Sequence, residues 1–258
     1  MTHRVPLEIE FHPMQLHCLG TAGYHPSETR QTSSYFLPES GVALDAGTGM
    51  FRLPERIQTS TLDILLSHAH LDHVVGLTFL LGILYQRPVD VVRVWGEEEK
   101  LSAVRTHLTS QYLFPVELPV QWCPIDELSE IELDDCRVTW RQQNHPGGSV
   151  AYRIDWHDGK SLVYATDSTG DHDEATLNWM GGVDVLLHEC NFHDSQKEWA
   201  IKTGHCYLQK VSEIAESVQP KQLLLTHINP VDELTLPADD ERFAMPVSIV
   251  ADHDEITF

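Results

Sequence analysis

The stretch that decides the fold is Leu62-Asp63-Ile64-Leu65-Leu66-Ser67-His68-Ala69-His70-Leu71-Asp72-His73. Its apolar first half predicts a buried strand, and the apolar residues 74–85 that follow predict a packed helix. Three imidazoles and a carboxylate therefore lie on a short turn between a strand and a helix. Imidazole and carboxylate groups are the usual ligands of zinc and its neighbours in the first transition row.

The spacing within this turn predicts two metals rather than one. His68 and His70 can point to the same side of an extended backbone, whereas Asp72 and His73 follow the turn and can face a second point. Taken singly, a histidine at a strand end is usually structural, and Asp72 can instead cap the following helix. Four ligand-type side chains within six positions favour the metal site over these alternatives.

The composition limits both the class of protein and the class of partner. The chain has 258 residues, enough for one large α/β domain or two small ones. Its 17 basic and 39 acidic residues give a net charge of −22, with no cluster of lysine or arginine in the sequence. Such a surface repels phosphate backbones, which disfavours large nucleic-acid partners. Small anionic substrates remain compatible with it, because bound metal ions would dominate the field inside a site.

Three features predict a cytoplasmic protein without a membrane anchor. Residues 1–6 lack the apolar core of a signal peptide. The longest apolar stretch, residues 74–85, is too short to span a bilayer. The cysteines are odd in number, scattered and without a CxxC pair, which favours a reducing compartment over a disulfide framework. They are Cys18, Cys123, Cys136, Cys190 and Cys206.

Strands and helices mix through both halves of the chain, which is typical of sheets that carry helices on their outer faces. No linker or repeat divides this order, so we expect one domain over residues 1–258. Residues 24–32 and 191–204 are predicted as loops that shape a pocket. Further strands are predicted at 14–19, 33–37, 41–44, 91–95, 115–122, 137–143, 149–154, 161–165, 183–187, 222–225, 247–250 and 255–258, and further helices at 97–108, 175–179 and 207–218.

Histidine and aspartate recur where predicted strands end. Strand ends on one edge of a layered fold are where loops converge into a site, and core histidines have no reason to prefer them. Asp45 follows a strand within the glycine-rich segment 45–49, where it is either part of an ordinary turn or a carboxylate that orients a metal-binding histidine. The other strand-end residues are His68, His145, Asp167, His188 and His227.

This ordered set resembles the signature of the metallo-β-lactamase superfamily: a strand-end Asp, then HxHxDH, a later His, a later Asp and a final His. The resemblance spans most of the chain and implies an α/β (α+β layered) fold, an αββα sandwich. It also implies two zinc ions, with manganese or iron as alternatives. On that resemblance His68, His70 and His145 would bind the first metal, and Asp72, His73 and His227 the second. Asp167 would bridge both.

Within that superfamily the chain looks like the tRNase Z-like phosphodiesterases. Residues 20–23 (GTAG), 187–192 (LHECNF), 204–207 (GHCY) and 225–227 (LTH) are similar to motifs of that branch. The resemblance implies that Glu189 and His205 assist proton transfer, and it places Asp72 among the catalytic residues. On their own, a glutamate at a strand end and a histidine before a helix would be ordinary polar residues.

Two departures argue against efficient processing of precursor tRNA. The PxKxRN loop of the branch appears as residues 26–31 with Glu28 in place of the lysine. The protruding arm that grips tRNA has no room in residues 145–167, which a hairpin already fills. Cyclic phosphodiesterases of the phosphonate pathway, which lack the arm, are a nearer analogy. They carry an extra cysteine-rich zinc site, however, for which this chain has no cluster near its start.

The sequence therefore predicts a binuclear metal-dependent hydrolase. We expect a phosphodiesterase that acts on a small or cyclic phosphodiester through attack by a metal-bridged hydroxide. The alternatives are a tRNase Z-type endoribonuclease, a hydrolase of carboxylic esters, thioesters or lactones, an iron or manganese redox protein, and a non-catalytic scaffold. The expected partner is a small phosphoester rather than a large nucleic acid or a membrane, and a homodimer is left open.

Overall fold

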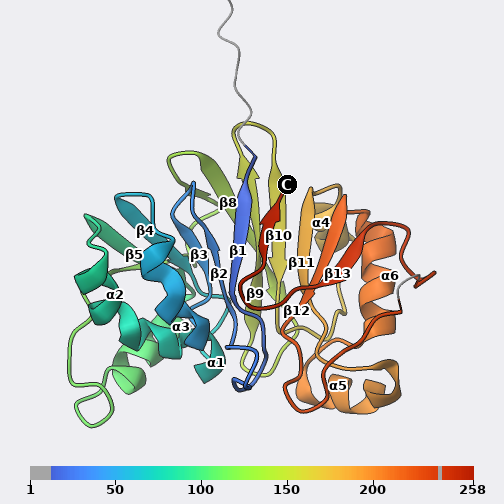
Figure 1. The fold of residues 1–258 in the computed structure, drawn as a ribbon, viewed down its shortest axis with the longest axis horizontal. Helices are drawn as coiled ribbons and strands as arrows, with labels where there is room; N and C mark the ends of the chain where they lie inside the picture. Colours follow the sequence, from blue (N-terminus) through green and yellow to red (C-terminus); the bar gives the residue numbers. More distant parts are fainter. Residues whose placement is uncertain (1–12, 238–239) are drawn as a thin grey trace, which may run out of the picture.

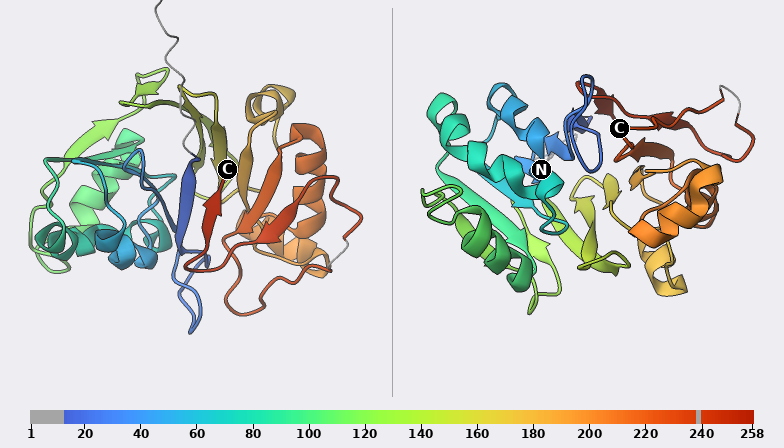
Figure 2. Two further views of the ribbon diagram at one scale, coloured as in Figure 1. Left: turned by 45° about the horizontal axis from the view of Figure 1, so that its top comes forward. Right: turned by 90° about the horizontal axis from the view of Figure 1, so that it is seen from below.

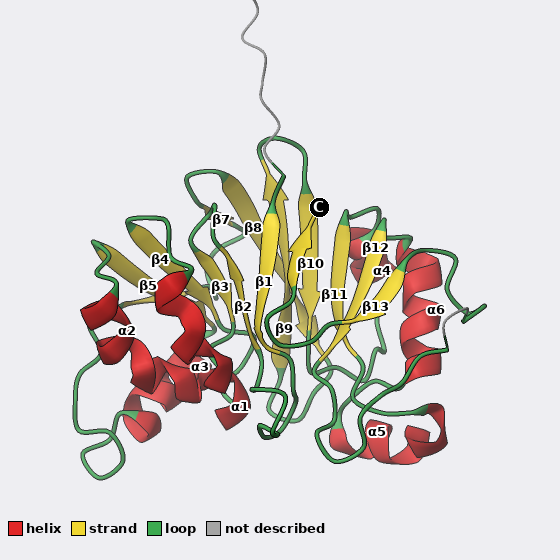
Figure 3. Cartoon of the chain, viewed as in Figure 1, coloured by secondary structure: helices red, strands yellow, loops and turns green. Residues whose placement is uncertain are grey.

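Two seven-stranded sheets face each other, and helices cover the outer face of each one (Figures 1 and 3). The computed structural model describes residues 13–237 and 240–258. The four layers, helix–sheet–sheet–helix, are seen edge-on in the right panel of Figure 2. The predicted αββα sandwich is confirmed. The prediction of one domain over residues 1–258 stays a prediction, because part of that range lies outside the described residues.

The first sheet has the strand order β14-β1-β2-β3-β4-β5-β6. Its strands from β3 to β6 are parallel, whereas β14, β1, β2 and β3 pair antiparallel. The strands are β1 (Gln15–Gly20), β2 (Ser34–Leu37), β3 (Val42–Leu44), β4 (Thr61–Leu65), β5 (Val91–Gly96), β6 (Gln121–Pro124) and β14 (Glu255–Thr257).

The second sheet mirrors this plan, with the order β13-β12-β11-β10-β9-β8-β7. Its strands from β10 to β13 are parallel, and β7 to β10 pair antiparallel. The strands are β7 (Ile131–Glu132), β8 (Cys136–Gln143), β9 (Ser149–Trp156), β10 (Ser161–Ala165), β11 (Val185–Glu189), β12 (Gln222–Thr226) and β13 (Val247–Ile249).

The helices divide between the two outer faces (Figure 1). None of those in the described part of the chain is long and apolar enough to cross a membrane. The first sheet carries η1 (Thr48–Glu55), α1 (Leu71–Val74), η2 (Val75–Phe79), α2 (Leu80–Gln86), α3 (Glu98–Ala103) and the π-helical turn η3 (Val104–Leu108); the second carries α4 (Glu174–Met180), η4 (Asp194–Gln196), α5 (Lys197–Thr203) and α6 (Leu208–Val218).

Alternation along the strands explains the layers. In β10, Leu162 and Tyr164 belong to the apolar core between the sheets, whereas Val163 and Ala165 pack beneath the helices of the second sheet. A strand buried on both faces reads as a continuous apolar run, as parallel strands covered by helices do. The sheets are also joined near the predicted metal turn, where the Tyr152 hydroxyl donates to Leu66 O at 2.8 Å.

Three sequence predictions of local structure were wrong. Residues 115–122 were predicted as a strand, but β6 begins only at Gln121, because Pro115 and Pro119 lack the N–H groups that a ladder needs. The single helix predicted for 74–85 is broken into three pieces. Gly76 N donates to Ala46 O at 2.7 Å, a contact to the neighbouring loop that interrupts the helix.

The third difference lies in the segments predicted as loops or turns. Residues 191–204 contain η4 and α5, and the glycine-rich turn after Asp45 continues into η1. The five cysteines are all free, as expected from their scatter.

A candidate binuclear metal centre

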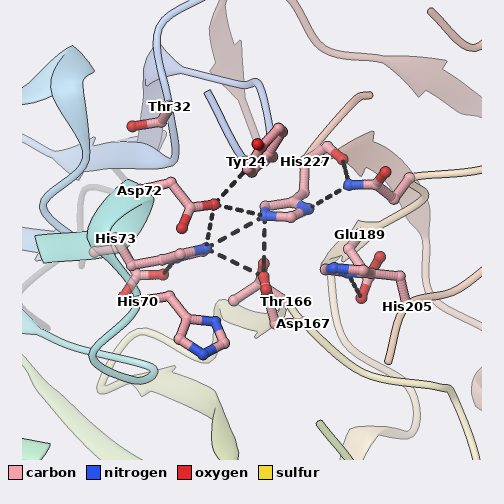
Figure 4. Close-up of polar contacts among 12 residues, drawn as sticks. Tyr24, Thr32, His70, Asp72, His73, Thr166, Asp167, Glu189, His205 and His227 are labelled. Carbon is pink, nitrogen blue, oxygen red and sulfur yellow. Dashed lines mark hydrogen bonds and ion pairs between the residues drawn. The ribbon is translucent and has the colours of Figure 1, made fainter. Parts of the chain in front are cut away.

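The structure brings all seven predicted ligand residues together at one edge of the sandwich. They come from the carboxyl ends of β4, β10 and β12 and from the loop before β9, where loops of a layered fold converge. Figure 4 shows the side chains of Asp72, His73, Asp167 and His227 pointing toward one another. Two groups of ligand atoms within 4.8 Å of one another contain the seven residues, His68, His70, His145 and Asp167 in one and Asp72, His73 and His227 in the other; a third group joins Asp167 and His227 to His205.

Asp167 faces the histidines of both groups. Its Oδ2 is 3.6 Å from His68 Nε2 and 3.3 Å from His145 Nε2. Its Oδ1 is 3.2 Å from His73 Nε2 and 3.1 Å from His227 Nε2. Each carboxylate oxygen therefore faces a different group, which is the arrangement that a carboxylate shared by two cations requires.

Asp45 fixes the orientation of two of the histidines. Its Oδ2 accepts hydrogen bonds from His73 Nδ1 at 2.7 Å and from the Ser67 hydroxyl at 2.8 Å. Because a carboxylate only accepts, His73 carries a proton on Nδ1, and this hydrogen bond directs its Nε2 toward the centre. The Ser67 hydroxyl in turn lies 3.0 Å from His68 Nδ1, which leaves the lone pair of His68 Nε2 facing Asp167. The alternative of an ordinary turn residue at Asp45 therefore fails.

His145 is oriented from the opposite side of the site. Its Nδ1 donates to the carbonyl oxygen of Gly204 at 2.9 Å, so that Nε2 faces His70 Nδ1 at 3.2 Å. Gly204 ends α5 in the left-handed conformation, with φ of 85°, which glycine adopts without strain. The helix that the sequence did not reveal thus supplies the acceptor that holds a predicted ligand.

The donor set fits a pair of divalent cations. His68 Nε2 is buried without a hydrogen-bond partner, and burial holds the pKa of His68 well below its ordinary value, so the ring presents a bare lone pair. Burial alone would lower the pKa of His73, but Asp167, Asp72 and Asp45 outweigh it and raise that pKa well above its ordinary value. The neutral His68 ring offers a lone pair, and the neighbouring carboxylates attract positive charge. This combination suits zinc and the other divalent ions that His/Asp sites bind.

Strained backbone is concentrated at the same place. Asp45, Asp167 and His227 have φ of 56°, 49° and 54°, and Tyr24 has φ of 64°. A residue other than glycine in this region costs about 1–3 kcal/mol and persists only where its surroundings hold it. Tyr24 is held by its N–H group, which donates to Asp72 Oδ2 at 2.8 Å.

Glu189 and His205 lie together beside the cluster (Figure 4). Glu189 Oε1 is 3.2 Å from His205 Nδ1 and accepts from Ser168 N at 2.6 Å. Burial lowers the pKa of His205, but the charge and hydrogen bond of Glu189 outweigh it and raise the pKa to about 9. The His205 ring stacks on His227, with centroids 5.3 Å apart. A ring nitrogen of His205 also lies within 4.8 Å of the ligand atoms of Asp167 and His227.

Known proteins share both the sequence pattern and the fold. The family model described as "Beta-lactamase superfamily domain" matches residues 41–228, which contain the whole ligand series. The chain belongs to the beta-lactamase superfamily. It is accordingly a metal-dependent hydrolase, and the fold with its His/Asp cluster indicates a site for two metal ions.

Within the superfamily the chain resembles the ribonuclease Z-like branch. Ribonuclease Z of Gemmatimonas aurantiaca is 25% identical over 84% of this chain and 86% of its own length, and that of Archaeoglobus fulgidus is 24% identical over 82% and 86%. The human short-form tRNase Z superposes with a TM-score of 0.74 at 20% identity over 94% of this chain and 98% of its own. A diphosphatase of the PhnP family superposes with a TM-score of 0.75 at 18% identity, over 96% and 98%.

The roles of two residues that support the metal centre were not predicted from the sequence. Asn191 Nδ2 lies 3.0 Å from His227 Nδ1 and donates to His227 O at 3.1 Å, so Asn191 holds the last ligand. Asp252 accepts from Thr21 N at 3.0 Å and Gln31 N at 2.7 Å, and so ties both ends of the loop that carries Tyr24. Asn191 lies in the segment 187–192 named for its resemblance, but the partners of both residues are remote in the sequence, so their contacts could not be read from it.

One strand-end histidine lies outside the cluster. His188 is fully buried on β11, and its Nδ1 donates to Glu189 O at 2.7 Å. Its nearest aromatic neighbour is His172, with ring centroids 6.4 Å apart.

Proposed function

We propose that the chain is a zinc-dependent phosphodiesterase that hydrolyses a small phosphodiester, linear or cyclic. The observation that carries this proposal is Asp167, whose two oxygens face two separate groups of ligand atoms. Sites for two metals about 3.5–4 Å apart are typical of enzymes that cleave phosphoesters by in-line displacement. Relatives named ribonuclease Z and a structural neighbour named a diphosphatase support chemistry at phosphorus.

The proposed metal ligands follow the two groups. One ion would be held by His68, His70 and His145, the other by Asp72, His73 and His227, and both by Asp167. When bound, two divalent cations polarise the phosphoryl oxygens and activate water for attack. Asp45 orients His68 and His73, and the N–H of Tyr24 orients Asp72.

We assign proton transfer to His205. Glu189 accepts from its Nδ1, so the charge of a doubly protonated ring is balanced and Nε2 can hold a proton next to the cluster. From there His205 can protonate the leaving oxygen as the bond to phosphorus breaks. A well-placed general acid contributes about 10²–10⁴-fold to the rate.

A small substrate is favoured over a large nucleic acid. The chain carries a net charge of −22, which repels a phosphate backbone. Residues 145–167 are used by β9, β10 and their short connections, so they hold no protruding arm. The match to ribonuclease Z over more than four fifths of the chain nevertheless makes precursor tRNA the second candidate substrate.

The test is metal analysis followed by a substrate panel. We expect two zinc ions per chain and hydrolysis of bis-p-nitrophenyl phosphate or a 2′,3′-cyclic nucleotide in preference to p-nitrophenyl acetate. Faster cleavage of the carboxylic ester would overturn the assignment in favour of ester chemistry. Efficient cleavage of precursor tRNA would replace the small substrate by the second candidate, and bound iron with a visible absorption band would favour a redox protein.

A further inference from the structure

A cavity of about 530 Å³ opens beside the candidate metal centre. This volume lies within the range of sites that enclose a small-molecule ligand. Two residues that line the cavity also belong to the surroundings of the metal centre: His205, and Asn191, which contacts His227. The lining residues are Tyr24, Asn191, Phe192, Gln196, Trp199, Thr203, His205, Asn229, Val231 and Asp232.

Large side chains with aromatic or apolar surface are exposed at this cavity. Tyr24 is 78%, Trp199 53% and Val231 79% exposed, whereas Phe192 is buried at 5%. Three exposed apolar groups around one cavity mark a ligand site better than the same groups scattered over a surface. Tyr24 is also held in a strained conformation by its hydrogen bond to Asp72, so its position is coupled to the proposed metal ligand (Figure 4).

Away from His205, the residues that line the cavity offer a second phosphate little positive charge. Among the described residues that line it there is no lysine or arginine, and the one carboxylate is Asp232. Lys202 belongs to the same helix as Trp199, but its ammonium lies over the Trp199 ring, 4.8 Å from the centroid. Asp232 accepts from Gln196 Nε2 at 3.0 Å, so away from His205 the polar part of the wall consists of a carboxylate, a hydroxyl and neutral amides.

Lys100 lies at a different cavity beside the centre. A smaller hollow of about 210 Å³ is lined by His68, His70 and Lys100 together with the Gly147–Gly148 turn. The two cavities flank the cluster, one beside His68 and His70 and the other beside His205. The Lys100 ammonium lies 3.3 Å from Glu97 Oε2, and Glu99 lines the same hollow, so the uncharged side of Trp199 is the one that suits an uncharged part of a substrate.

We infer that the leaving group of the phosphodiester carries a planar, uncharged ring that stacks on Trp199 and Tyr24. A nucleobase and an aryl group both have this chemistry. The inference rests on the proposed function and adds the class of substrate. Because His205 lines this cavity, the leaving oxygen is the one that it can protonate. Water forms the new bond to phosphorus, the bond to the leaving oxygen breaks, and the products are a phosphomonoester and the ring-bearing alcohol.

The test compares three diesters of methyl phosphate that differ only in the second alcohol: thymidine through its 5′ oxygen, p-nitrophenol and methanol. Stacking of a base on an aromatic side chain makes Trp199→Ala lower kcat/KM for a ring-bearing ester by about five- to a hundredfold. The methyl ester should change by less than about twofold, because it has no ring to stack. Trp199→Phe, which keeps a ring, should restore most of the loss.

Tyr112→Ala is the matched control, since Tyr112 is an exposed aromatic residue (94%) that does not line the cavity. A loss on the thymidine ester alone identifies a nucleoside, and a loss on the p-nitrophenyl ester alone identifies an aryl group. Equal losses on all three esters, or no loss, overturn the inference while leaving the phosphodiesterase intact.

If no ester is cleaved, a binding measurement tests the cavity assignment separately from the proposed phosphodiesterase function. Saturation-transfer NMR with thymidine and with p-nitrophenol reports binding without catalysis. We expect a signal for at least one of them that Trp199→Ala removes and Tyr112→Ala keeps. Such a signal without hydrolysis would refute the proposed function but support the cavity assignment, and its absence for both ligands would refute the cavity assignment.

Discussion

Replacing Asp45 by asparagine tests whether a carboxylate that is not itself a proposed metal ligand holds the ligand histidines in place for metal binding. Asp45 is fully buried, and its Oδ2 accepts from His73 Nδ1, the Ser67 hydroxyl and the Tyr164 hydroxyl at 2.7, 2.8 and 2.7 Å. Its Oδ1 accepts from Ser67 N at 2.7 Å. In Asp45→Asn the amide oxygen can keep the bond to Ser67 N, but the NH₂ group then faces three donors and can accept from none of them.

The magnitude follows from these contacts. Hydrogen bonds to a charged group contribute about 1.5–3 kcal/mol each, and breaking a buried charged pair costs about 3–5 kcal/mol. Because the three bonds share one oxygen, we expect Asp45→Asn to lower the free energy of unfolding by about 3–5 kcal/mol rather than by their sum. Loss of the partner that orients a ligand should weaken metal binding about 10–100-fold.

Asp184→Asn is a close control. Asp184 also accepts the N–H and the hydroxyl of a serine, Ser161, at 2.8 and 3.2 Å, but it lies at the opposite end of β11 from Glu189. Guanidinium unfolding would measure stability, and chelator competition followed by metal analysis would measure affinity. If Asp45→Asn held its metals as tightly as Asp184→Asn, Asp45 would have no part in preparing the site.

The remaining predictions concern the centre itself. Asp167→Ala should lose metal at one or both positions and all hydrolysis, and unchanged zinc content with normal turnover would refute the shared carboxylate. His205→Ala should keep both metals but lower kcat about 10²–10⁴-fold, and equal turnover would remove it from the mechanism. Gly23→Ala would place a Cβ 2.3 Å from His227 Cε1, so it should reduce metal content, checked against Gly82→Ala, whose Cβ meets nothing. Removing metal with EDTA should lower the free energy of unfolding by about 4 kcal/mol, relative to free metal at a thousandfold excess over Kd, and the melting temperature should fall with it; an unchanged melting temperature would contradict metal binding.

The turn at residues 68–73 could be predicted because its chemistry is local. Four ligand types lie within one short stretch, and the apolar run before it leaves little choice but a buried strand. The positions of Asp167 and His227 could also be predicted, since each follows a strand whose residues are almost all apolar. In such cases, a pattern of a few neighbouring residues fixes both the element and the position of the side chain at its end.

The supporting residues could not be predicted because their contacts join distant parts of the chain. Asn191 holds His227 across 36 positions, and Asp252 holds Thr21 across 231. Helix α5 was hidden for a different reason: its seven residues include the exposed Trp199 and Ile201, so no clear apolar stripe marks it. Because Trp199 is exposed, it adds no apolar stripe that would predict the helix. The same exposure makes its ring available to a ligand.

The local charges of the site show why substrate binding should depend entirely on metal. Asp72 and Asp167 face only histidines in the ion pairs described, and the nearby Glu189 adds another carboxylate. Without cations this edge of an acidic chain repels a phosphodiester, whereas two divalent ions would reverse the local field. Phosphate, the simplest product-like anion, should therefore bind the zinc-loaded protein and not the EDTA-treated one. Calorimetric titration of both forms measures this, and equal phosphate binding would mean that the anion site lies away from the metal cluster.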